Sequence, residues 1–270
     1  MIKACVIGLS KIGIIHCNSI KKFKKTNLSF VFDKNKKLRE KYSKKYNCNT
    51  AKNFEQILKK KDIKLFIIAS PTKTHEYFIK QLIKYKKMIY CEKPILMNVK
   101  KLNSLVKEIK LKKIKFCVGL NRRFSTPYMK MKKKIKGKKI DIIHITSRTA
   151  KPNVDQSVRN GGLFMDKGFH FFDLACWFGS STPKKLITIA DPISTEDFLK
   201  KKDYSDAIVN MKLKNKVIVE LRFGRRCRIG QEEKIEIFGK NLKINSDYYF
   251  NKKDLYKDWN ILHKNTYYKC

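Results

Sequence analysis

Hydrophobic residues in the first 120 positions gather in short unbroken runs that are separated by longer segments of mixed polarity. The clearest run, Leu65-Phe66-Ile67-Ile68-Ala69, is closed by Ser70-Pro71. Runs without polar interruptions are typical of central parallel strands that are buried on both faces. We therefore expect parallel strands at residues 3–7, 28–32, 65–69, 88–91 and 115–119.

The segments between these runs have the spacing of amphipathic helices. Within residues 75–85, for example, Tyr77, Phe78, Leu82 and Tyr85 are available for one helix face. Helices are expected at residues 12–23, 35–46, 54–60, 75–85 and 99–112. Strands that alternate with helices indicate an α/β domain, whose parallel sheet is joined by right-handed crossovers.

The pattern changes after Asn121. Helices are expected at residues 128–135 and 164–178, and strand-like runs at residues 140–148, 186–189, 207–213, 216–222, 234–238 and 242–245. These later strands have no full helices between them, which indicates an α+β domain with a mostly antiparallel sheet. The sequence thus predicts two domains, residues 1–121 and 122–270.

Basic residues dominate the charge. Lys and Arg together number 64 against 23 acidic residues, which gives a formal net charge of +41, and only nine of the 64 are Arg. Nucleic-acid surfaces favour clustered arginine, whereas here lysine is spread along the chain beside many Asn and Ile. We attribute the charge to A/T-rich codons and expect weak binding to polyanions but no specific nucleic-acid partner. A nucleic-acid-binding module remains the alternative from another class.

The eight cysteines show no metal-site spacing such as Cys-x-x-Cys, so no metal is expected. The first residues are too short and too quickly interrupted for a signal peptide, and no apolar run is as long as a membrane span. We expect a cytoplasmic protein with reduced thiols and no membrane partner.

A glycine-containing turn, Gly8-Leu9-Ser10-Lys11-Ile12-Gly13, follows the first strand and opens the first helix. It approximates G-x-G-x-x-G, with Ser10 at the second glycine. In a dinucleotide-binding turn the first glycine permits the tight bend, and the last permits close packing of helix and strand. Asp33, at the end of the second strand, is placed to accept a ribose hydroxyl. The pattern indicates a Rossmann dinucleotide-binding domain; a tight turn with a solvated aspartate is the alternative.

Two further groups of residues offer chemistry. Glu92-Lys93-Pro94 stands at the carboxyl end of a predicted strand, which is the edge where open α/β sheets bind ligands. Asp166 and His170 are four residues apart, so they share one face of a helix, and Asp173 lies one turn further on. A carboxylate beside an imidazole can fix its tautomer and raise its basicity. An aspartate at a helix start and a partly buried histidine are the structural alternative.

These motifs together resemble the family of glucose–fructose oxidoreductase and inositol dehydrogenase, the Gfo/Idh/MocA family. The resemblance extends from about Ile2 to about Ser246. Its marks are the glycine turn, Ser70-Pro71 with His75, Glu92-Lys93-Pro94, Gly119-Leu120-Asn121-Arg122-Arg123-Phe124, and Gly161-Gly162 leading into Asp166 and His170. The last two marks are closer to the inositol 2-dehydrogenase branch.

The resemblance implies an NAD-dependent dehydrogenase acting on CH-OH groups, with NADP as the alternative cofactor. Lys93, Asp166 and His170 are the implied catalytic residues. The implied cofactor-binding residues are Gly8, Ser10, Lys11, Ile12, Gly13, Asp33, Ser70, Pro71, His75, Glu92 and Lys93. The implied substrate-binding residues are Lys93, Asn121, Arg122, Asp166, His170 and Asp173.

The expected substrate is a cyclic polyol, most closely myo-inositol, and a homo-oligomer through the sheet of the second domain is expected. The alternatives are a sugar or nucleotide-sugar oxidoreductase of the same family in surface-polysaccharide synthesis and a catalytically inactive sugar-binding relative. Ser10 departs from the family pattern. The sequence also stops at Tyr267-Tyr268-Lys269-Cys270, where relatives continue with a helical segment, so we expect a second domain that is truncated relative to the family.

Overall fold

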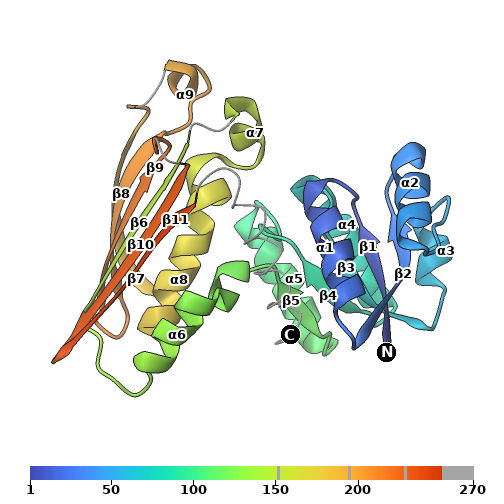
Figure 1. Cartoon of the computed structure of the whole chain (residues 1–270), viewed down its shortest axis with the longest axis horizontal. Coiled ribbons are helices and arrows are strands. Elements are labelled where there is room, and N and C mark those ends of the chain that lie inside the picture. The colour runs from blue at the N-terminus through green and yellow to red at the C-terminus, as the bar shows by residue number, and fades with distance from the viewer. Residues whose placement is uncertain (151–152, 194–195, 228–229, 251–270) are drawn as a thin grey trace. The chain divides into compact units, whose positions relative to one another are not determined.

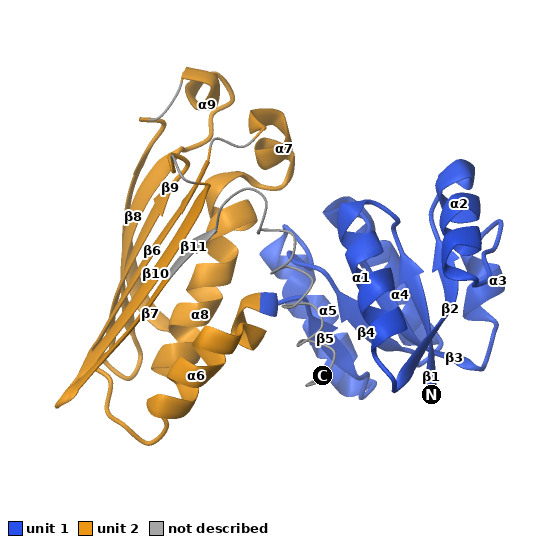
Figure 2. Ribbon diagram, in the orientation of Figure 1, with its two compact units in different colours: residues 1–121, 259–270 blue, residues 122–258 orange. Residues whose placement is uncertain are grey.

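The computed structural model describes residues 1–150, 153–193, 196–227 and 230–250, with side chains up to residue 247. The chain end at residues 267–270, noted above, lies outside this described part. The chain divides into two compact units, of which the first comprises Met1–Asn121 and the second begins at Arg122 (Figure 2). The predicted extent of the second domain, residues 122–270, reaches past the described residues and stays a prediction.

The first unit is a parallel five-stranded sheet with strand order β2-β1-β3-β4-β5 (Figure 1). Its strands are β1 Ile2–Ile7, β2 Thr26–Phe32, β3 Ile63–Ile68, β4 Met88–Cys91 and β5 Phe116–Val118. Its helices are α1 Lys11–Lys22, α2 Lys36–Tyr46, α3 Phe54–Leu58, α4 His75–Lys84 and α5 Val99–Leu111. The predicted α/β architecture is confirmed.

Local chemistry explains where three of these helices begin. The side chains of Asn35, Asn53 and Asn98 each accept a hydrogen bond from a backbone N–H three residues later, at the first turn of α2, α3 and α5. Asparagine is a favoured N-cap because its carbonyl satisfies a donor that the helix leaves unpaired. The abundant Asn of this sequence therefore helps to fix the ends of its helices.

The buried face of α4 differs from the predicted one. His75, Ile79, Leu82 and Ile83 are buried, at a spacing of four, three and one residues, whereas Tyr77 is 52% exposed. Of the predicted face, Leu82 is buried and Phe78 packs against the core. The prediction was wrong for Tyr77 and Tyr85, because tyrosine can remain at the surface with its hydroxyl in water. The two isoleucines have no such option and determine the face that packs on the sheet.

The second unit is a six-stranded sheet with strand order β11-β10-β6-β9-β8-β7, with α6 and α8 on one face (Figure 1). Only the β6–β9 pair is parallel among the described pairs. The strands are β6 Ile142–Thr149, β7 Pro183–Asp191, β8 Asp206–Leu213, β9 Ile218–Gly224, β10 Gln231–Gly239 and β11 Leu242–Phe250. The helices are α6 Thr126–Lys134, α7 Val154–Arg159, α8 Phe169–Gly179 and α9 Glu196–Lys200. The mostly antiparallel sheet is confirmed.

The segment that precedes α8 is not regular α-helix. Leu163–Gly168 forms a π-helical turn, which the sequence pattern merged with α8 into one helix. It starts directly after Gly162, whose φ is +73° and whose Cβ, if present, would lie 2.4 Å from Oδ1 of Asp203. The same oxygen accepts a hydrogen bond from the Leu163 backbone N–H at 3.1 Å. Asp203 thus anchors the start of this turn. No helix in the described residues is long and apolar enough to span a membrane.

Candidate cofactor and catalytic site

The glycine turn leaves no room for side chains at its two glycines. Gly8 has φ of +90°, and a Cβ there would lie 2.6 Å from the backbone nitrogen of Ser70. A Cβ on Gly13 would lie 1.8 Å from the carbonyl oxygen of Gly8. The turn therefore brings α1 against β1 and against the loop after β3, as the dinucleotide-binding pattern requires.

Asp33 is fixed beside this turn. Its Oδ2 accepts a hydrogen bond from the Leu9 backbone N–H at 2.8 Å, and its Oδ1 accepts one from the Asn35 backbone N–H at 2.9 Å. Each carboxylate oxygen retains a further lone pair, which can accept a ribose hydroxyl. Ser10 is the N-cap of α1 and, within the described part, makes no side-chain capping bond, and the helix N-terminus that it opens is the usual place for a pyrophosphate in this kind of turn. These residues fit a nicotinamide dinucleotide.

Other predicted cofactor residues surround the same sheet edge. Lys11 and Ile12 form the first turn of α1, and Ser70 and Pro71 form the loop after β3. The Ser70 hydroxyl lies 2.7 Å from the Thr74 hydroxyl, which itself donates to the Pro71 carbonyl oxygen at 2.7 Å. The loop is therefore held by its own short hydrogen bonds.

Glu92-Lys93-Pro94 directly follows β4, and the Lys93–Pro94 peptide bond is cis. Because β1 to β4 are parallel, the carboxyl end of β4 lies at the same edge of the sheet as the glycine turn and Asp33. Lys93 is half-buried there. The sequence motif and the cofactor turn therefore share one side of the first unit.

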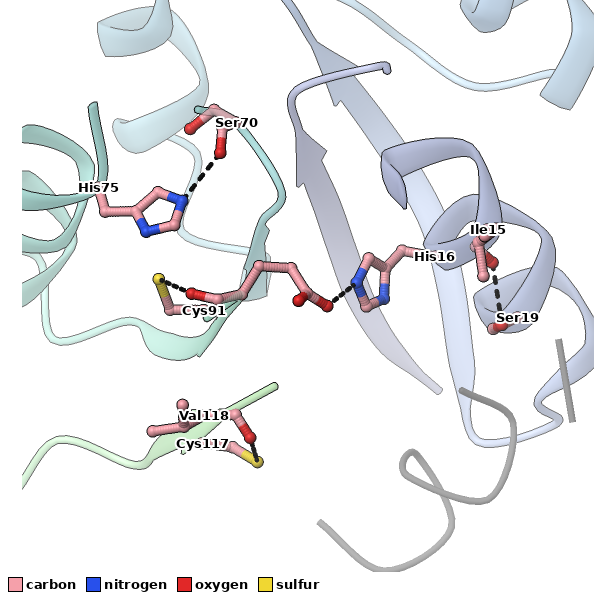
Figure 3. Close-up of polar contacts among 9 residues, drawn as sticks. Ile15, His16, Ser19, Ser70, His75, Cys91, Cys117 and Val118 are labelled. Carbon is pink, nitrogen blue, oxygen red and sulfur yellow. Dashed lines mark hydrogen bonds and ion pairs between the residues drawn. The ribbon is translucent and has the colours of Figure 1, made fainter. Parts of the chain in front are cut away.

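Two buried histidines contact this segment. Figure 3 shows the contact made by His16 and the contact of His75 with Ser70. Nε2 of His16 on α1 lies 2.8 Å from Oε1 of Glu92. The ring nitrogens of His75 lie 2.8 Å from the Ser70 carbonyl oxygen and 3.0 Å from the Pro94 carbonyl oxygen. His75 was predicted to bind cofactor, and the structure places it between two backbone carbonyls instead of at an open surface. Sequence reasoning missed His16, whose only signal is its place three residues after Gly13.

In the second unit, Asp166 lies in the π-helical turn and His170 in the first turn of α8. Oδ1 of Asp166 accepts a hydrogen bond from the Asn160 side-chain amide at 3.3 Å, and Oδ2 lies 3.8 Å from Nη1 of Arg225. Arg225 is only 2% exposed, and its guanidinium also stands over the Phe198 ring. Arg225 and Asn160 restrain the carboxylate of Asp166, and no sequence motif pointed to either residue. The predicted role of Asp166 in orienting His170 stays a prediction.

The predicted substrate residues Arg122 and Asp173 each form an ion pair within the second unit. Nη2 of Arg122 lies 2.6 Å from Oε1 of Glu233 on β10, and Oε2 of Glu233 accepts a hydrogen bond from the Tyr128 hydroxyl at 2.7 Å. Asp173 accepts a hydrogen bond from Nε of Arg123 at 2.7 Å and contacts its Nη2 as well. Asn121 begins the helical turn Asn121–Phe124, whose other residues belong to the second unit.

Lys167 follows Asp166 in the chain and interacts electrostatically with both Arg122 and Glu233. It is 8% exposed, and its ammonium stands 5.9 Å from the centre of the Phe171 ring. Burial lowers the pKa of Lys167 from 10.5 to about 7; the Glu233 carboxylate opposes this shift, whereas the Arg122 guanidinium adds to it. No group of three or more metal-ligating side chains is found among the described residues.

The two units match the two domains of one class of oxidoreductase. Residues 2–120 match the model of an oxidoreductase family with an NAD-binding Rossmann fold, and residues 128–245 match the model of the GFO/IDH/MocA C-terminal domain. The chain belongs to the GFO/IDH/MocA family of NAD-binding oxidoreductases, as its motifs predicted.

Named relatives are similar over most of the chain. Myo-inositol 2-dehydrogenase of Thermotoga maritima is 28% identical over 90% of this chain and 74% of its own length. Inositol 2-dehydrogenase of Rhizobium meliloti is 28% identical over 87% of this chain and 72% of its own length. The crystal structure of a myo-inositol dehydrogenase from Corynebacterium glutamicum has a TM-score of 0.90 at 19% identity and covers 99% of this chain and 86% of its own. This structural likeness confirms the fold.

Proposed function

We propose that this protein oxidises a secondary hydroxyl of a cyclic polyol, of the myo-inositol type, to a ketone. In the balanced reaction the alcohol and NAD⁺ give the ketone, NADH and one proton. The observation that carries the proposal is the position of Lys93 at the sheet edge that also holds the glycine turn and Asp33. The similarity to two inositol 2-dehydrogenases over most of the chain supports the substrate class.

Each proposed catalytic group has one task. The glycine turn and Asp33 of the first unit would hold NAD, which would supply the hydride acceptor. His170 accepts the hydroxyl proton, and Lys93 stabilises the negative charge that develops on the oxygen. Asp166, restrained by Asn160 and Arg225, orients His170 and the substrate.

A substrate panel tests the proposal. The purified protein is supplied with NAD and either inositol isomers, free sugars or nucleotide-sugars, and NADH formation is followed by absorbance. Oxidation of an inositol isomer is the expected result. Preference for a sugar or nucleotide-sugar would assign the chain to the alternative activity of the same family. Binding of polyols without oxidation would favour a sugar-binding relative.

The cofactor preference rests on Asp33. Its carboxylate accepts ribose hydroxyls and repels a 2′-phosphate, so NAD should bind at least about tenfold more tightly than NADP. Intrinsic fluorescence titrated with each cofactor measures the ratio. The variant D33N should narrow it, whereas K34Q and K37Q, which remove nearby cations able to receive that phosphate, should widen it. Tighter binding of NADP to the parent chain would contradict the assignment.

We propose that copies of this chain associate into a homo-oligomer through the open face of the second sheet. Two apolar cross-strand pairs lie exposed on this face, Ile189 with Ile208 and Ile142 with Ile218. Exposed apolar side chains on a sheet face are stabilised when a second copy covers them. Light scattering at physiological salt should give at least a dimer, and I208K should shift it towards monomer. A monomeric parent would be evidence against the proposal, as the repulsion of +41 charges per chain would then prevail.

We also propose a cytoplasmic location. All cysteines among the described residues are free thiols, namely Cys5, Cys17, Cys48, Cys91, Cys117, Cys176 and Cys227. Free thiols are the rule in reducing compartments, where disulfides do not persist.

A further inference from the structure

His16 and His75 hold the Glu92-Lys93-Pro94 segment from its two ends. His16 is fully buried on α1, and Nε2 lies 2.8 Å from Oε1 of Glu92. Since an ionised carboxylate only accepts hydrogen bonds, this ring nitrogen donates to Glu92. The His16 ring also packs edge-on against Tyr90, with 5.1 Å between ring centres. The residue before Lys93 is therefore fixed by a side chain from the helix that the glycine turn opens.

His75 acts on the residue after Lys93. It is 1% exposed at the start of α4, with Nδ1 3.0 Å from the Pro94 carbonyl oxygen and Nε2 2.8 Å from the Ser70 carbonyl oxygen. A neutral imidazole carries one N–H and donates to one of these carbonyls at a time, whereas an imidazolium donates to both. His75 thus ties the loop that carries Pro94 to the loop after β3.

The packing around Glu92 strengthens this arrangement. Its backbone N–H donates to the Ile68 carbonyl oxygen at 2.9 Å, which continues the pairing of β4 with β3. A Cβ on Gly119 would lie 3.0 Å from the carboxylate atoms of Glu92, so the absence of a side chain there lets the carboxylate lie against the backbone after β5. Figure 3 shows the two histidines on either side of this strand end.

We propose that His16 and His75 are positioning residues for catalysis, which fix the backbone on both sides of Lys93 and so place its ammonium at the substrate oxygen. The inference rests on the catalytic role given to Lys93 under the proposed function. Its consequence is that one contact, from the buried His16 to Glu92, couples the cofactor-binding helix to the catalytic lysine. A displacement of about 1 Å at such a group can lower the rate by about a hundredfold.

Pairs of amide substitutions test the two contacts separately. Asparagine places its amide nitrogen near the position of histidine Nδ1, and glutamine places it near Nε2. H16Q keeps a donor for Glu92, whereas H16N does not; H75N keeps a donor for the Pro94 carbonyl, whereas H75Q does not. We expect H16N and H75Q to lower kcat at least about tenfold, and the conservative H16Q and H75N to restore it to within about threefold of the parent. KM and the Kd for NAD should change less than about threefold.

A purely structural role predicts a different pattern. Loss of packing would lower Tm and would affect both members of each pair alike, because both replace the imidazole ring. His144 on β6, which is half-buried against the Phe238 ring, supplies the control substitutions H144N and H144Q. If kcat fell equally in H16N and H16Q, and equally in H75N and H75Q, the positioning role would be overturned.

A second readout separates this inference from the proposed function. Lys93 acetylation by acetic anhydride, measured by mass spectrometry on the NADH-saturated protein, needs no substrate. H16N and H75Q should raise the acetylation rate of Lys93 at least about threefold, because the released ammonium is more accessible, and H16Q and H75N should not. If the chain oxidises no polyol but the variants still differ in this way in the acetylation rate of Lys93, the proposed function is rejected and the positioning role is kept. Equal rates in all four variants would reject the positioning role.

Discussion

Replacing His170 with alanine should lower the turnover of the best polyol substrate by about a hundredfold or more, the usual loss when a general base is removed. Lys93→Ala should cost a comparable factor, because the charge that develops on the substrate oxygen loses its cation. The affinity for NAD should survive H170A, since His170 belongs to the second unit and the glycine turn to the first. Turnover, Tm and the Kd for NAD are measured on the same preparations.

Control variants make this result specific. H144A removes a half-buried histidine of the second unit that contacts the Phe238 ring, and K64A removes an exposed lysine of β3. Both should keep turnover within about threefold of the parent, as is usual for substitutions away from a site. If H170A and K93A also kept the turnover of the parent, the catalytic assignment would be wrong, and the Asp166–His170 pair would be a packing feature of the helix.

Glu233→Gln should destabilise the second unit by about 3 kcal/mol or more, because it leaves buried cations without their anion. Arg122 lies 2.6 Å from this carboxylate, and Lys167 feels its charge as well. Lys167→Met is the matched control in the same group of buried charges. It should stabilise the second unit, since it removes a buried cation and keeps a side chain of similar length. Urea unfolding of the parent and both variants measures the two changes.

The pH dependence gives a second test of Lys167. Its pKa is about 7 in the folded protein and 10.5 ordinarily, so between these values the unfolded chain binds more protons than the folded one. The free energy of unfolding should therefore rise with pH across this window, and the proton-linked cost of burying Lys167 should be fully present only below about pH 7. The stabilisation by K167M should be about 2–3 kcal/mol smaller at pH 9 than at pH 6.

Two outcomes would contradict this account of the buried charges. A Glu233→Gln protein as stable as the parent would mean that the Arg122–Glu233 pair is solvated or replaceable. A stabilisation by K167M that stays constant from pH 6 to pH 9 would mean that the Lys167 ammonium remains charged in the folded protein throughout that range.

Functional residues could be predicted from the sequence where their role depends on neighbours within a few residues along the chain. The glycine turn was recognisable because Gly8 and Gly13 answer a steric demand within one strand–helix unit, where a Cβ on Gly13 would meet the Gly8 carbonyl. Asp33 was recognisable because the end of a strand can also be located from the residues immediately around it. The catalytic roles came from the resemblance, since a lysine in a chain with so many lysines carries no signal by its residue type alone.

Contacts between distant segments could not be predicted in this way. His16 and Glu92 are 76 residues apart, and Tyr128 and Glu233 are 105 apart. The predicted face of α4 was wrong at Tyr77 for the same reason, because Tyr77 and Ile79 differ in burial only once the sheet beneath them is in place. Periodicity shows that a helix has an apolar side, but it does not say which of two candidate sides meets the sheet.

The sequence by itself determined the α/β and α+β architecture, the cofactor turn and the family, because unbroken apolar runs, glycine positions and short motifs depend on neighbours within a few residues. The tertiary structure alone decided that His75 binds backbone carbonyls, that Arg122 pairs with Glu233, and that Lys167 is buried. Burial and ion pairing depend on which segments meet in space, and in a polar, lysine-rich sequence many side chains are equally suited to each place until the fold selects one.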